Sequence, residues 1–485
     1  MSSKEKVGEL NIRDRTVFIR DNLPIMRCLN DNCIDLVYLD PPFNKNRKFH
    51  GVIGSPAEGT GFKDYWERSD TKDEEIQYVK QKHLKLHQLL ETVDGVGVKG
   101  SKYYLYYMAV RLIEIHRILK PTGSVYLHCD DTMSHYLKLL MDTIFGVQNY
   151  QNEIVWKRAS GKSSARRRFD REVDTLFFYS KSDDYFFQSS YKPYTEEFIK
   201  KTYRESDSKG RYAQADITGP NVNSKDPEWK GWHPSSIGRS WSLNLLTLDS
   251  IMPREEHKKL STLEKLELLD KHGFIHYSSN KKPSWKKYLH LMQGDKVRNL
   301  WDDINNVRGN EDTHYETQKP LKLLDRIIKA SSQEGDVVLD PFCGCATTCV
   351  SADRLGRKWI GIDIAPAAER LVVSRIKKNQ GLWQDIVSRS DLPARTDLGK
   401  IPKYNSPENK KKLYGEQGGD CALCEDHFEY RHLVVDHIIP KIDGGQDNLE
   451  NLQLTCANCN SRKGKKSHAE IKLKIKEERK NIRKH

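Results

Sequence analysis

Two short turns in this sequence combine an acidic side chain with residues that fix the backbone, and each follows an apolar run. Residues 336–339 lead into Asp340-Pro-Phe-Cys-Gly, and residues 34–39 lead into Asp40-Pro-Pro-Phe. Apolar runs of this length are typical of buried parallel strands. Because ligands of open α/β sheets bind at the carboxyl ends of the strands, both turns are candidates for binding or chemistry.

The turn that begins at Asp340 has features of a site for a nucleotide-like ligand. Helix-compatible residues follow it, and the apolar run 358–362 predicts another strand that ends on Asp363. An acidic residue roughly 20 positions beyond a glycine turn can accept hydrogen bonds from two ribose hydroxyls. We therefore expect Asp340, Phe342, Gly344 and Asp363 to line a cofactor site, with an ordinary α/β connection as the alternative.

The residues around this turn resemble a known cofactor motif. Residues 340–348 (DPFCGCATT) and 361–364 (GIDI) are similar to the S-adenosylmethionine motif of the amino-group DNA methyltransferases, usually DPFxGSGTT. Cys345 stands where that family has Ser, and Ala346 replaces the last Gly, for which Ala is the mildest substitute. The resemblance implies S-adenosyl-L-methionine as the cofactor and a Rossmann-like α/β fold.

The second turn, Asp40-Pro-Pro-Phe, resembles the catalytic motif of the same family. Pro41 and Pro42 fix the backbone, so the Asp40 carboxylate and the Pro41 carbonyl present two rigid acceptors to an exocyclic NH2 group. Two acceptors that hold its hydrogens direct the nitrogen lone pair toward a methyl donor, while Phe43 can stack on a base swung out of the helix. Taken alone, the motif is also compatible with a plain proline-rich turn.

Two further segments are similar to this family. Residues 317–320 (TQKP) resemble the segment at the methionine end of the cofactor, so Lys319 would meet its carboxylate, unless the segment only caps the following helix. Residues 20–23 resemble an acidic turn near the cofactor adenine, which makes Asp21 a candidate, although a surface turn fits equally. The motif order is that of the beta class, and the aromatic residue after DPP favours adenine N6 over cytosine N4.

The order of the segments also predicts the domains. Strands and helices alternate around both motifs, whereas the region between them loses this alternation and is rich in Trp and Lys, as expected for target recognition. A stretch rich in Pro, Asp, Ser and Lys then precedes the last domain. The predicted boundaries are 1–185 and 300–387 for the methyltransferase domain, 186–299 for target recognition, 388–412 for a linker and 413–485 for the last domain.

Four cysteines near the C-terminus have the spacing of metal ligands. Cys421 and Cys424 form one CxxC pair, Cys456 and Cys459 form another, and 31 residues separate the pairs. Four thiolates can close one tetrahedral Zn2+ site, and a domain of about 60 residues needs such a stabilising element. A thioredoxin-like redox pair is the alternative, but one pair would suffice for it and neither lies in a βαβ context.

The segment between and around these cysteines resembles a nuclease. The motifs VDHIIP, NLQL and CNSRKG are similar to those of HNH endonucleases, which have a ββα fold with one divalent metal ion. The resemblance implies that His437 is the general base for the attacking water and that Asn451 orients it. Asp436 and Asn460 would hold Mg2+. A structural Asp–His pair beside the zinc site is the alternative for Asp436 and His437.

The charge of the chain favours a polyanionic partner. Its 485 residues include 81 basic and 68 acidic ones, a net charge of +13, although a merely basic surface would look the same. Residues 157–171, with three consecutive arginines, suit phosphate contacts, with a solvated charge run as the alternative. Residues 44–66 are interpreted as a lid over base and cofactor, with an inert insertion as the alternative. The C-terminal domain with the four cysteines, called the finger from here on, adds four candidates for phosphate contacts: Arg462, Lys463, Lys465 and Lys466. With no membrane-spanning run or signal peptide, we expect a cytoplasmic protein of a prokaryote or phage.

Together these features predict a bifunctional restriction–modification protein that acts on double-stranded DNA. A site-specific methyltransferase, with adenine N6 favoured, would protect sites that an HNH endonuclease cuts when they are unmethylated. One HNH site cuts one strand, so a double-strand break requires a homodimer or successive nicks. The alternatives are a solitary DNA methyltransferase whose finger only binds DNA and a mobile-element nicking enzyme.

Overall fold

The structure is a computed structural model of the whole chain. It describes all residues except 1–6, 51–54, 56, 57, 59, 60, 95, 98, 159–166, 168, 221–225, 280, 281, 381–384, 465–470, 473, 476, 477 and 479–485. The chain forms two compact units, the first made of Met1–Gln188 with Arg298–His485 and the second of Ser189–Val297. No helix of the described residues is long and apolar enough to cross a membrane.

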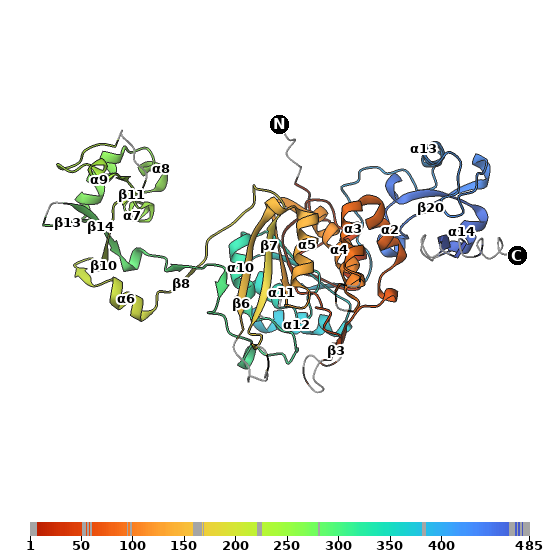
Figure 1. The fold of residues 1–485 in the computed structure, drawn as a ribbon, viewed down its shortest axis with the longest axis horizontal. Coiled ribbons are helices and arrows are strands. Elements are labelled where there is room, and N and C mark those ends of the chain that lie inside the picture. The colour runs from red at the N-terminus through yellow and green to blue at the C-terminus, as the bar shows by residue number, and fades with distance from the viewer. Residues whose placement is uncertain are drawn as a thin grey trace. The chain divides into compact units, whose positions relative to one another are not determined.

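The first unit is built on a nine-stranded sheet in the order β16-β6-β7-β5-β2-β17-β18-β1-β19. Figure 1 labels β6 and β7 of this sheet. Strand β7 is antiparallel to both neighbours, and the other pairs are parallel. The sheet confirms the predicted Rossmann-like fold. Its strands are β1 (Thr16–Ile19), β2 (Ile34–Leu39), β5 (Leu119–Cys129), β6 (Tyr150–Lys157), β7 (Val173–Ser180), β16 (Leu300–Trp301), β17 (Val337–Asp340), β18 (Lys358–Asp363) and β19 (Val387–Arg389).

Helices pack on this sheet because their apolar residues recur at helical spacing. In α4 (Ser101–Ile118), residues such as Leu105, Met108, Leu112 and Ile115 are buried on one face. One group of helices comprises α1 (Asn22–Arg27), α4 and α5 (Ser134–Phe145), and another comprises α10 (Leu321–Ser331), α11 (Thr347–Arg354) and α12 (Pro366–Gln380). With helices covering it, β2 is buried over its whole length, as parallel strands usually are.

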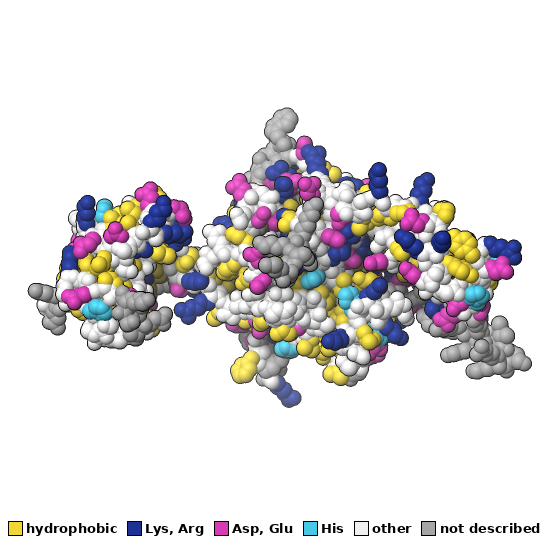
Figure 2. Space-filling view, turned by 90° about the horizontal axis from the view of Figure 1, so that it is seen from above, with side chains coloured by type: hydrophobic (Ala, Val, Ile, Leu, Met, Phe, Trp, Pro, Cys, Tyr) yellow, Lys and Arg dark blue, Asp and Glu magenta, His cyan; other side chains and the backbone are white. Residues whose placement is uncertain are grey.

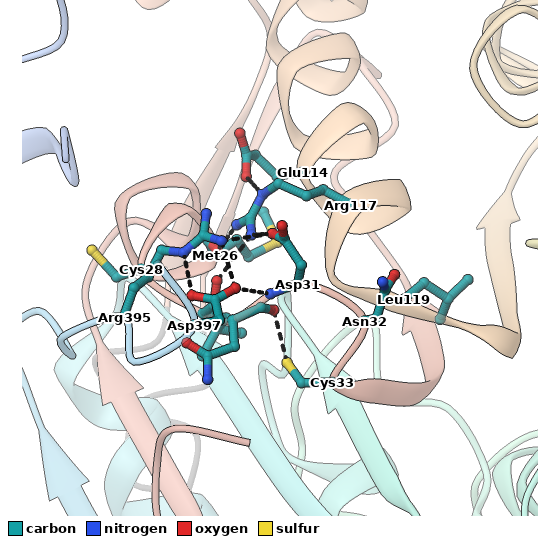
Figure 3. A network of polar contacts seen from close by, with 12 residues as sticks. Met26, Cys28, Asp31, Asn32, Cys33, Glu114, Arg117, Leu119, Arg395 and Asp397 are labelled. Atoms are coloured by element: carbon teal, nitrogen blue, oxygen red, sulfur yellow. Dashed lines mark hydrogen bonds and ion pairs between the residues drawn. The ribbon is translucent and has the colours of Figure 1, made fainter. Parts of the chain in front are cut away.

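After β19 the chain stays attached to the first unit through a network of charged groups (Figure 3). Arg395 donates to Asp31 at 2.8 Å, and the backbone N–H of Asp31 donates to Asp397 at 2.8 Å. Arg117 pairs with Asp31 as well and donates to Glu114 at 2.8 Å. The beginning of the predicted linker is therefore fixed against the loop between α1 and β2.

The second unit has a core of its own. Its four-stranded antiparallel sheet has the order β13-β14-β10-β9, and α9 (Thr262–Lys271) packs beside it. The strands are β9 (Glu205–Asp207), β10 (Gly210–Ala215), β13 (Ile275–Tyr277) and β14 (Pro283–Tyr288). Trp229 and Trp285, part of the aromatic composition noted in the sequence, are buried in this core with Tyr288. These side chains therefore stabilise the unit rather than cover its surface.

The C-terminal domain lies within the first unit and has the predicted ββα arrangement. Strands β20 (Leu433–His437) and β21 (Leu452–Cys456) pair antiparallel, and α14 (Ala457–Lys463) follows directly. Helix α13 (Pro407–Gln417) packs on β21. The core of this domain is small and includes the four clustered cysteines beside residues such as Leu433 and Leu454.

A turn of this domain, which begins with the short helix η7 (Lys441–Asp443), contacts α1. The carbonyl of Ile442 accepts from Arg20 at 2.5 Å, and Lys72 donates to the Asp443 carboxylate at 2.8 Å. Gly444 has φ +82°, and a Cβ on it would lie 2.6 Å from the carbonyl oxygen of Pro24 in α1. Only glycine fits this position without displacing the turn.

We predict that Gly444→Ala destabilises the protein more than a matched change elsewhere. Gly399 also has a left-handed φ, +66°, but no atom within 4 Å of an added Cβ. Gly399→Ala should therefore cost only the backbone strain, about 1–2 kcal/mol. Gly444→Ala should cost more because the Cβ also meets α1. Calorimetric unfolding of both variants checks this, and equal losses would show that the turn is not seated against α1.

Candidate functional site

A cavity of about 960 Å³ opens at the carboxyl ends of β2, β17 and β18. The size suits a nucleoside-like ligand together with a second planar group. The structure brings together here all ten residues that the sequence proposes for the cofactor and for the amino group: Asp21, Asp40, Pro41, Pro42, Phe43, Lys319, Asp340, Phe342, Gly344 and Asp363.

The glycine turn after β17 is hydrogen-bonded to the carboxylate of Asp363, the last residue of β18. Asp363 accepts from the backbone N–H of Gly344 at 2.9 Å and from that of Ala365 at 2.8 Å. Gly344 has φ +47°, and a Cβ on it would lie 3.0 Å from the hydroxyl of Tyr315. Ala346, where the motif has Gly, has a left-handed backbone with φ +64°. Its Cβ therefore makes this backbone conformation strained, as it would not be for glycine.

Asp340, the last residue of β17, is a buried carboxyl group. Its oxygen accepts from the N–H of Phe342 at 3.0 Å. Burial raises the pKa of Asp340 to about 7, and the nearby carboxylates of Asp40 and Asp363 add to the rise although Thr348 donates a hydrogen bond. A cationic ligand in the cavity would therefore gain a counter-charge by ionising this group.

Asp21, whose side chain is 44% exposed, forms a network with the buried Arg111. It caps α1 by accepting from the N–H of Leu23 at 2.8 Å, and Arg111 donates to both of its oxygens at 3.0 Å. Burial raises the pKa of Asp21, but the Arg111 guanidinium and the Leu23 N–H outweigh it, so the pKa is lowered. Asn22 accepts from Arg111 at 2.7 Å and donates to the Pro341 carbonyl at 2.7 Å, which ties α1 to the cofactor turn.

Lys319 also lines the cavity and pairs with Asp40. Its Nζ is 2.5 Å from Oδ2 of Asp40 and 5.7 Å from the centroid of the Phe43 ring. Both side chains are largely buried. In this structure Lys319 therefore contacts Asp40, and a ligand carboxylate would have to share its ammonium group.

Sequence reasoning missed a hydrogen-bonded chain beneath Phe43. The hydroxyl of Tyr38 lies 3.0 Å from Nδ1 of His128, whose Nε2 lies 3.2 Å from Asp174. His128 is fully buried and stacks against Phe43 with centroids 6.2 Å apart. Although burial opposes it, the hydrogen bond from His128 lowers the pKa of Asp174 to about 2. The feature of the sequence that could have indicated this chain is a histidine and an aspartate within the otherwise apolar strands β5 and β7.

A hairpin of the predicted lid lines the mouth of the same cavity. Strands β3 (Arg47–His50) and β4 (Gly61–Asp64) form it, and Arg47, Phe49 and Lys63 face the cavity. Arg47 pairs with Glu316, beside the Lys319 segment, at 3.4 Å. Most of the basic stretch 157–171, including Arg166 and Arg168, lies outside the described residues.

The four cysteines form a compact cluster that suits a zinc ion. The sulfur atoms of Cys421, Cys424, Cys456 and Cys459 all lie within 4.8 Å of one another, and all four residues are buried. Backbone N–H groups point at two of the sulfurs, from Cys456 to Cys421 at 3.2 Å and from Cys459 to Cys456 at 3.4 Å. Such donors stabilise thiolates, the form that binds Zn2+.

His437 ends β20 and is held by a residue that sequence reasoning missed. Its Nε2 lies 2.7 Å from Oδ1 of Asp447, in the turn that follows. Asn451, expected to orient His437, contacts the backbone of the loop after it instead. Its Oδ1 accepts from the N–H of Ile439 at 2.8 Å, and its Nδ2 donates to the Gln446 carbonyl at 2.9 Å.

Asp436, the predicted Mg2+ ligand beside His437, uses one of its two carboxylate oxygens in hydrogen bonds within the protein. Its Oδ2 accepts from Lys463 at 2.5 Å and from Gln453 at 3.1 Å. Oδ1 takes no hydrogen bond from the described residues, so Asp436 and Asn460 with water could still hold the ion, which prefers few protein ligands. Lys463 is only 2% exposed, so the prediction that it contacts DNA phosphates is wrong. Lys465 and Lys466 lie outside the described residues.

The fold and these sites define an α/β domain with a nucleoside-sized cavity at its strand ends, joined to a ββα domain with four clustered cysteines positioned to bind a metal ion. Two family models match these parts. Residues 34–374 match the family described as DNA methylase, and residues 421–466 match the one described as HNH endonuclease. Since the first match covers more than half of the chain, the protein belongs to the DNA methylase family, and it carries an HNH domain.

Similar proteins include enzymes of restriction–modification systems. Type II methyltransferase M.EcaI of Enterobacter cloacae is 33% identical over 61% of this chain and 62% of its own length. The StyLTI Mod subunit, a type III restriction-modification enzyme of Salmonella typhimurium, is 25% identical over 68% of this chain and 48% of its own length. The chain thus spans less than two thirds of these relatives. The solved PvuII DNA methyltransferase (cytosine-N4-specific) is 15% identical with a TM-score of 0.36, covering 77% of this chain and 96% of its own.

The strain at Ala346 can be measured with a pair of substitutions. Ala346→Gly should raise the free energy of unfolding by about 0.5–1 kcal/mol, because glycine adopts the left-handed conformation without strain. Ala352→Gly, in the interior of α11, should lower it by about 1 kcal/mol. Calorimetry of both variants checks the prediction, which is wrong if the two changes have the same sign.

The pKa of Asp340 predicts how cofactor binding depends on pH. With a pKa of about 7, the carboxyl group is mostly neutral at pH 6 and mostly ionised at pH 8 before a ligand binds. S-adenosylmethionine carries a net positive charge and should bind the ionised form, so its Kd should fall roughly tenfold between these pH values. Titration calorimetry at pH 6, 7 and 8 measures this, with Asp340→Asn as the control. A Kd that is equally pH-dependent in both proteins contradicts the assignment.

Proposed function

We propose that this protein is a bifunctional restriction–modification enzyme, with a site-specific DNA methyltransferase and an HNH endonuclease in one chain. The observation that carries the proposal is the single cavity in which the Asp40-Pro-Pro-Phe turn faces the Asp340 and Asp363 carboxylates. The match of residues 421–466 to HNH endonucleases supports the second activity. The relatives named as restriction–modification proteins support a role in such a system.

For methylation, the residues of the chain hold and orient the target amino group. Asp40 and the Pro41 carbonyl accept its two hydrogens, Pro42 fixes their spacing, and Phe43, backed by His128, stacks on the base. S-adenosyl-L-methionine would supply the methyl group. Asp363 and Asp21 would bind its nucleoside part, while Lys319 and Asp340 would bind its charged amino-acid part. Phe342 and Gly344 would line the space between them.

The target is double-stranded DNA, with adenine N6 as the favoured position. An aromatic residue at position 43 after Asp-Pro-Pro is the feature that supports adenine over cytosine N4. The net charge of +13 suits this partner. Lys and Arg side chains are spread among acidic ones over the face seen in Figure 2, so contacts to phosphates would come from local groups such as those of the β3–β4 hairpin.

For cleavage, His437 would act as the general base toward water, with Asp436 and Asn460 holding Mg2+ and the four cysteines holding a structural Zn2+. Asn451 would act indirectly by fixing the loop after His437. A double-strand break would require a homodimer or two successive nicks. The ion pair between Asp436 and Lys463 favours the second candidate, a solitary methyltransferase whose finger only binds DNA.

Two substitutions should separate the activities. Asp40→Ala should lower methylation at least 100-fold, because the amino group loses an acceptor, and should leave cutting of unmethylated DNA intact. His437→Ala should lower cutting at least 100-fold through loss of the base and leave methylation intact. The measurement is gel analysis and modified-base sequencing of DNA incubated with S-adenosylmethionine and Mg2+, separately and together.

Each outcome of that measurement decides between the candidates. Cutting confined to unmethylated DNA is expected for the bifunctional enzyme. Methylation without cutting by the wild-type protein would leave the solitary methyltransferase. Modified-base sequencing identifies the methylated base, and methylcytosine instead of N6-methyladenine would overturn the preference for adenine.

A further inference from the structure

The carboxylate of Asp447 fixes which nitrogen of His437 carries a proton. Its Oδ1 lies 2.7 Å from Nε2 of His437. Burial raises the pKa of Asp447, but His437 and Lys441 outweigh it, so its pKa is lowered and the group is an ionised acceptor. A carboxylate can only accept, so the proton of a neutral His437 lies on Nε2 and the lone pair is on Nδ1.

The pair is held from the other side as well. Nζ of Lys441 lies 3.0 Å from Oδ1 and 3.1 Å from Oδ2 of Asp447, which fixes the carboxylate. The ring of Tyr404 packs on the ring of His437 with centroids 4.7 Å apart and an angle of 39° between the planes. The imidazole is mostly buried, with 12% of its side chain exposed. Its orientation is therefore set by a hydrogen bond and a ring contact together.

The loop between the two residues brings Asp447 back to His437. Gly445 donates to the Pro440 carbonyl at 3.1 Å, and Asn451 donates to the carbonyls of Ile439 at 3.1 Å and Gln446 at 2.9 Å. A Cβ on Gly445 would lie 1.8 Å from the Ile439 carbonyl oxygen, so the loop closes tightly. These contacts make the spacing between Asp447 and His437 a property of the fold and not a chance surface contact.

We propose that Asp447 is a positioning residue of the nuclease site, which keeps His437 in the Nε2–H tautomer so that Nδ1 can take a proton from water. This inference rests on the proposed nuclease function. The water oxygen would form a bond to phosphorus, its proton would pass to Nδ1, and the phosphorus–O3′ bond would break, with the leaving oxygen taking a proton from solvent. Asp447 itself would touch neither DNA nor metal.

Asp447→Asn gives the sharpest test because it preserves shape but not the hydrogen-bond direction. Lys441 can only donate, so it should draw the amide oxygen and turn the NH2 group toward His437. That arrangement places the imidazole proton on Nδ1, the wrong tautomer for a base. Asp447→Glu keeps the carboxylate, and its site is partly exposed, with 24% of the Asp447 side chain accessible, so it has room.

The experiment measures kcat and KM for cutting of unmethylated DNA with Mg2+, together with methylation, in the full-length chain. We expect Asp447→Ala to lower kcat about 10- to 100-fold with little change in KM. Asp447→Asn should be at least as severe, Asp447→Glu should retain most activity, and methylation should be unchanged in all three. Asp420→Asn is the matched control, because Asp420 forms an exposed pair with His427 at 3.2 Å in the same domain.

A spectroscopic readout separates this inference from the proposed function. In protein with 15N-labelled histidine at pH 8, the His437 signals, identified with His437→Asn, should show an unprotonated Nδ1 in the wild type and a protonated Nδ1 in Asp447→Asn. Wild-type activity in Asp447→Asn, or a protonated Nδ1 in the wild type, would overturn the positioning role. If the wild type cuts no DNA, the nuclease function fails, and the tautomer signals still report on the Asp447 contact.

Discussion

Three carboxylates at the ends of three adjacent parallel strands are the constraint on which the rest of the site depends. Asp40 follows β2, Asp340 ends β17 and Asp363 ends β18, and all three line one cavity. Like charges at such close quarters repel, so each needs its own compensation. Lys319 pairs with Asp40, and backbone N–H groups bind Asp363. For Asp340, burial raises the pKa to about 7, and the other two carboxylates add to the rise.

This electrostatic arrangement explains why a cationic cofactor suits the cavity. A positive ligand lowers the electrostatic repulsion among the three carboxylates and favours ionisation of Asp340. Its binding free energy therefore gains from reduced repulsion, which a neutral ligand would not provide. The same arrangement links ligand binding at Lys319 to the state of Asp40. In this structure Lys319 neutralises Asp40, and a ligand carboxylate that drew Lys319 away would leave Asp40 free to accept from an amino group.

The sequence predicts the parts of the structure that are local in the chain. Apolar runs followed by acidic turns place Asp40, Asp340 and Asp363 at strand ends, because a parallel strand and its turn are encoded by adjacent residues. The Tyr38–His128–Asp174 chain joins three strands far apart in sequence, and no local pattern indicates such contacts. These pairings depend on the order of strands in the sheet.

For charged residues of the C-terminal domain, too, the sequence does not predict which groups they contact. Lys463 belongs to a basic run that is typical of a solvated, DNA-facing helix, yet the fold buries it against Asp436. Asp447 lies in a Gly- and Asn-containing turn whose composition indicates only a loop. Its contact with His437 depends on the path of that loop, which Asn451 closes from its position just before β21. Residue type therefore indicates the chemistry to expect of these side chains, while loop geometry determines which groups they contact.

Helix α1 links the two domains of the first unit through a few side chains. At its beginning Asp21 and Asn22 join Arg111 and the Pro341 carbonyl beside the cofactor turn. Along its length it supports the turn with Gly444, three residues before Asp447. A shift of α1 would therefore displace both the turn that lines the cofactor cavity and the loop that orients His437. The buried Arg111 opposes such a shift, because moving α1 would leave its guanidinium without Asp21 and Asn22.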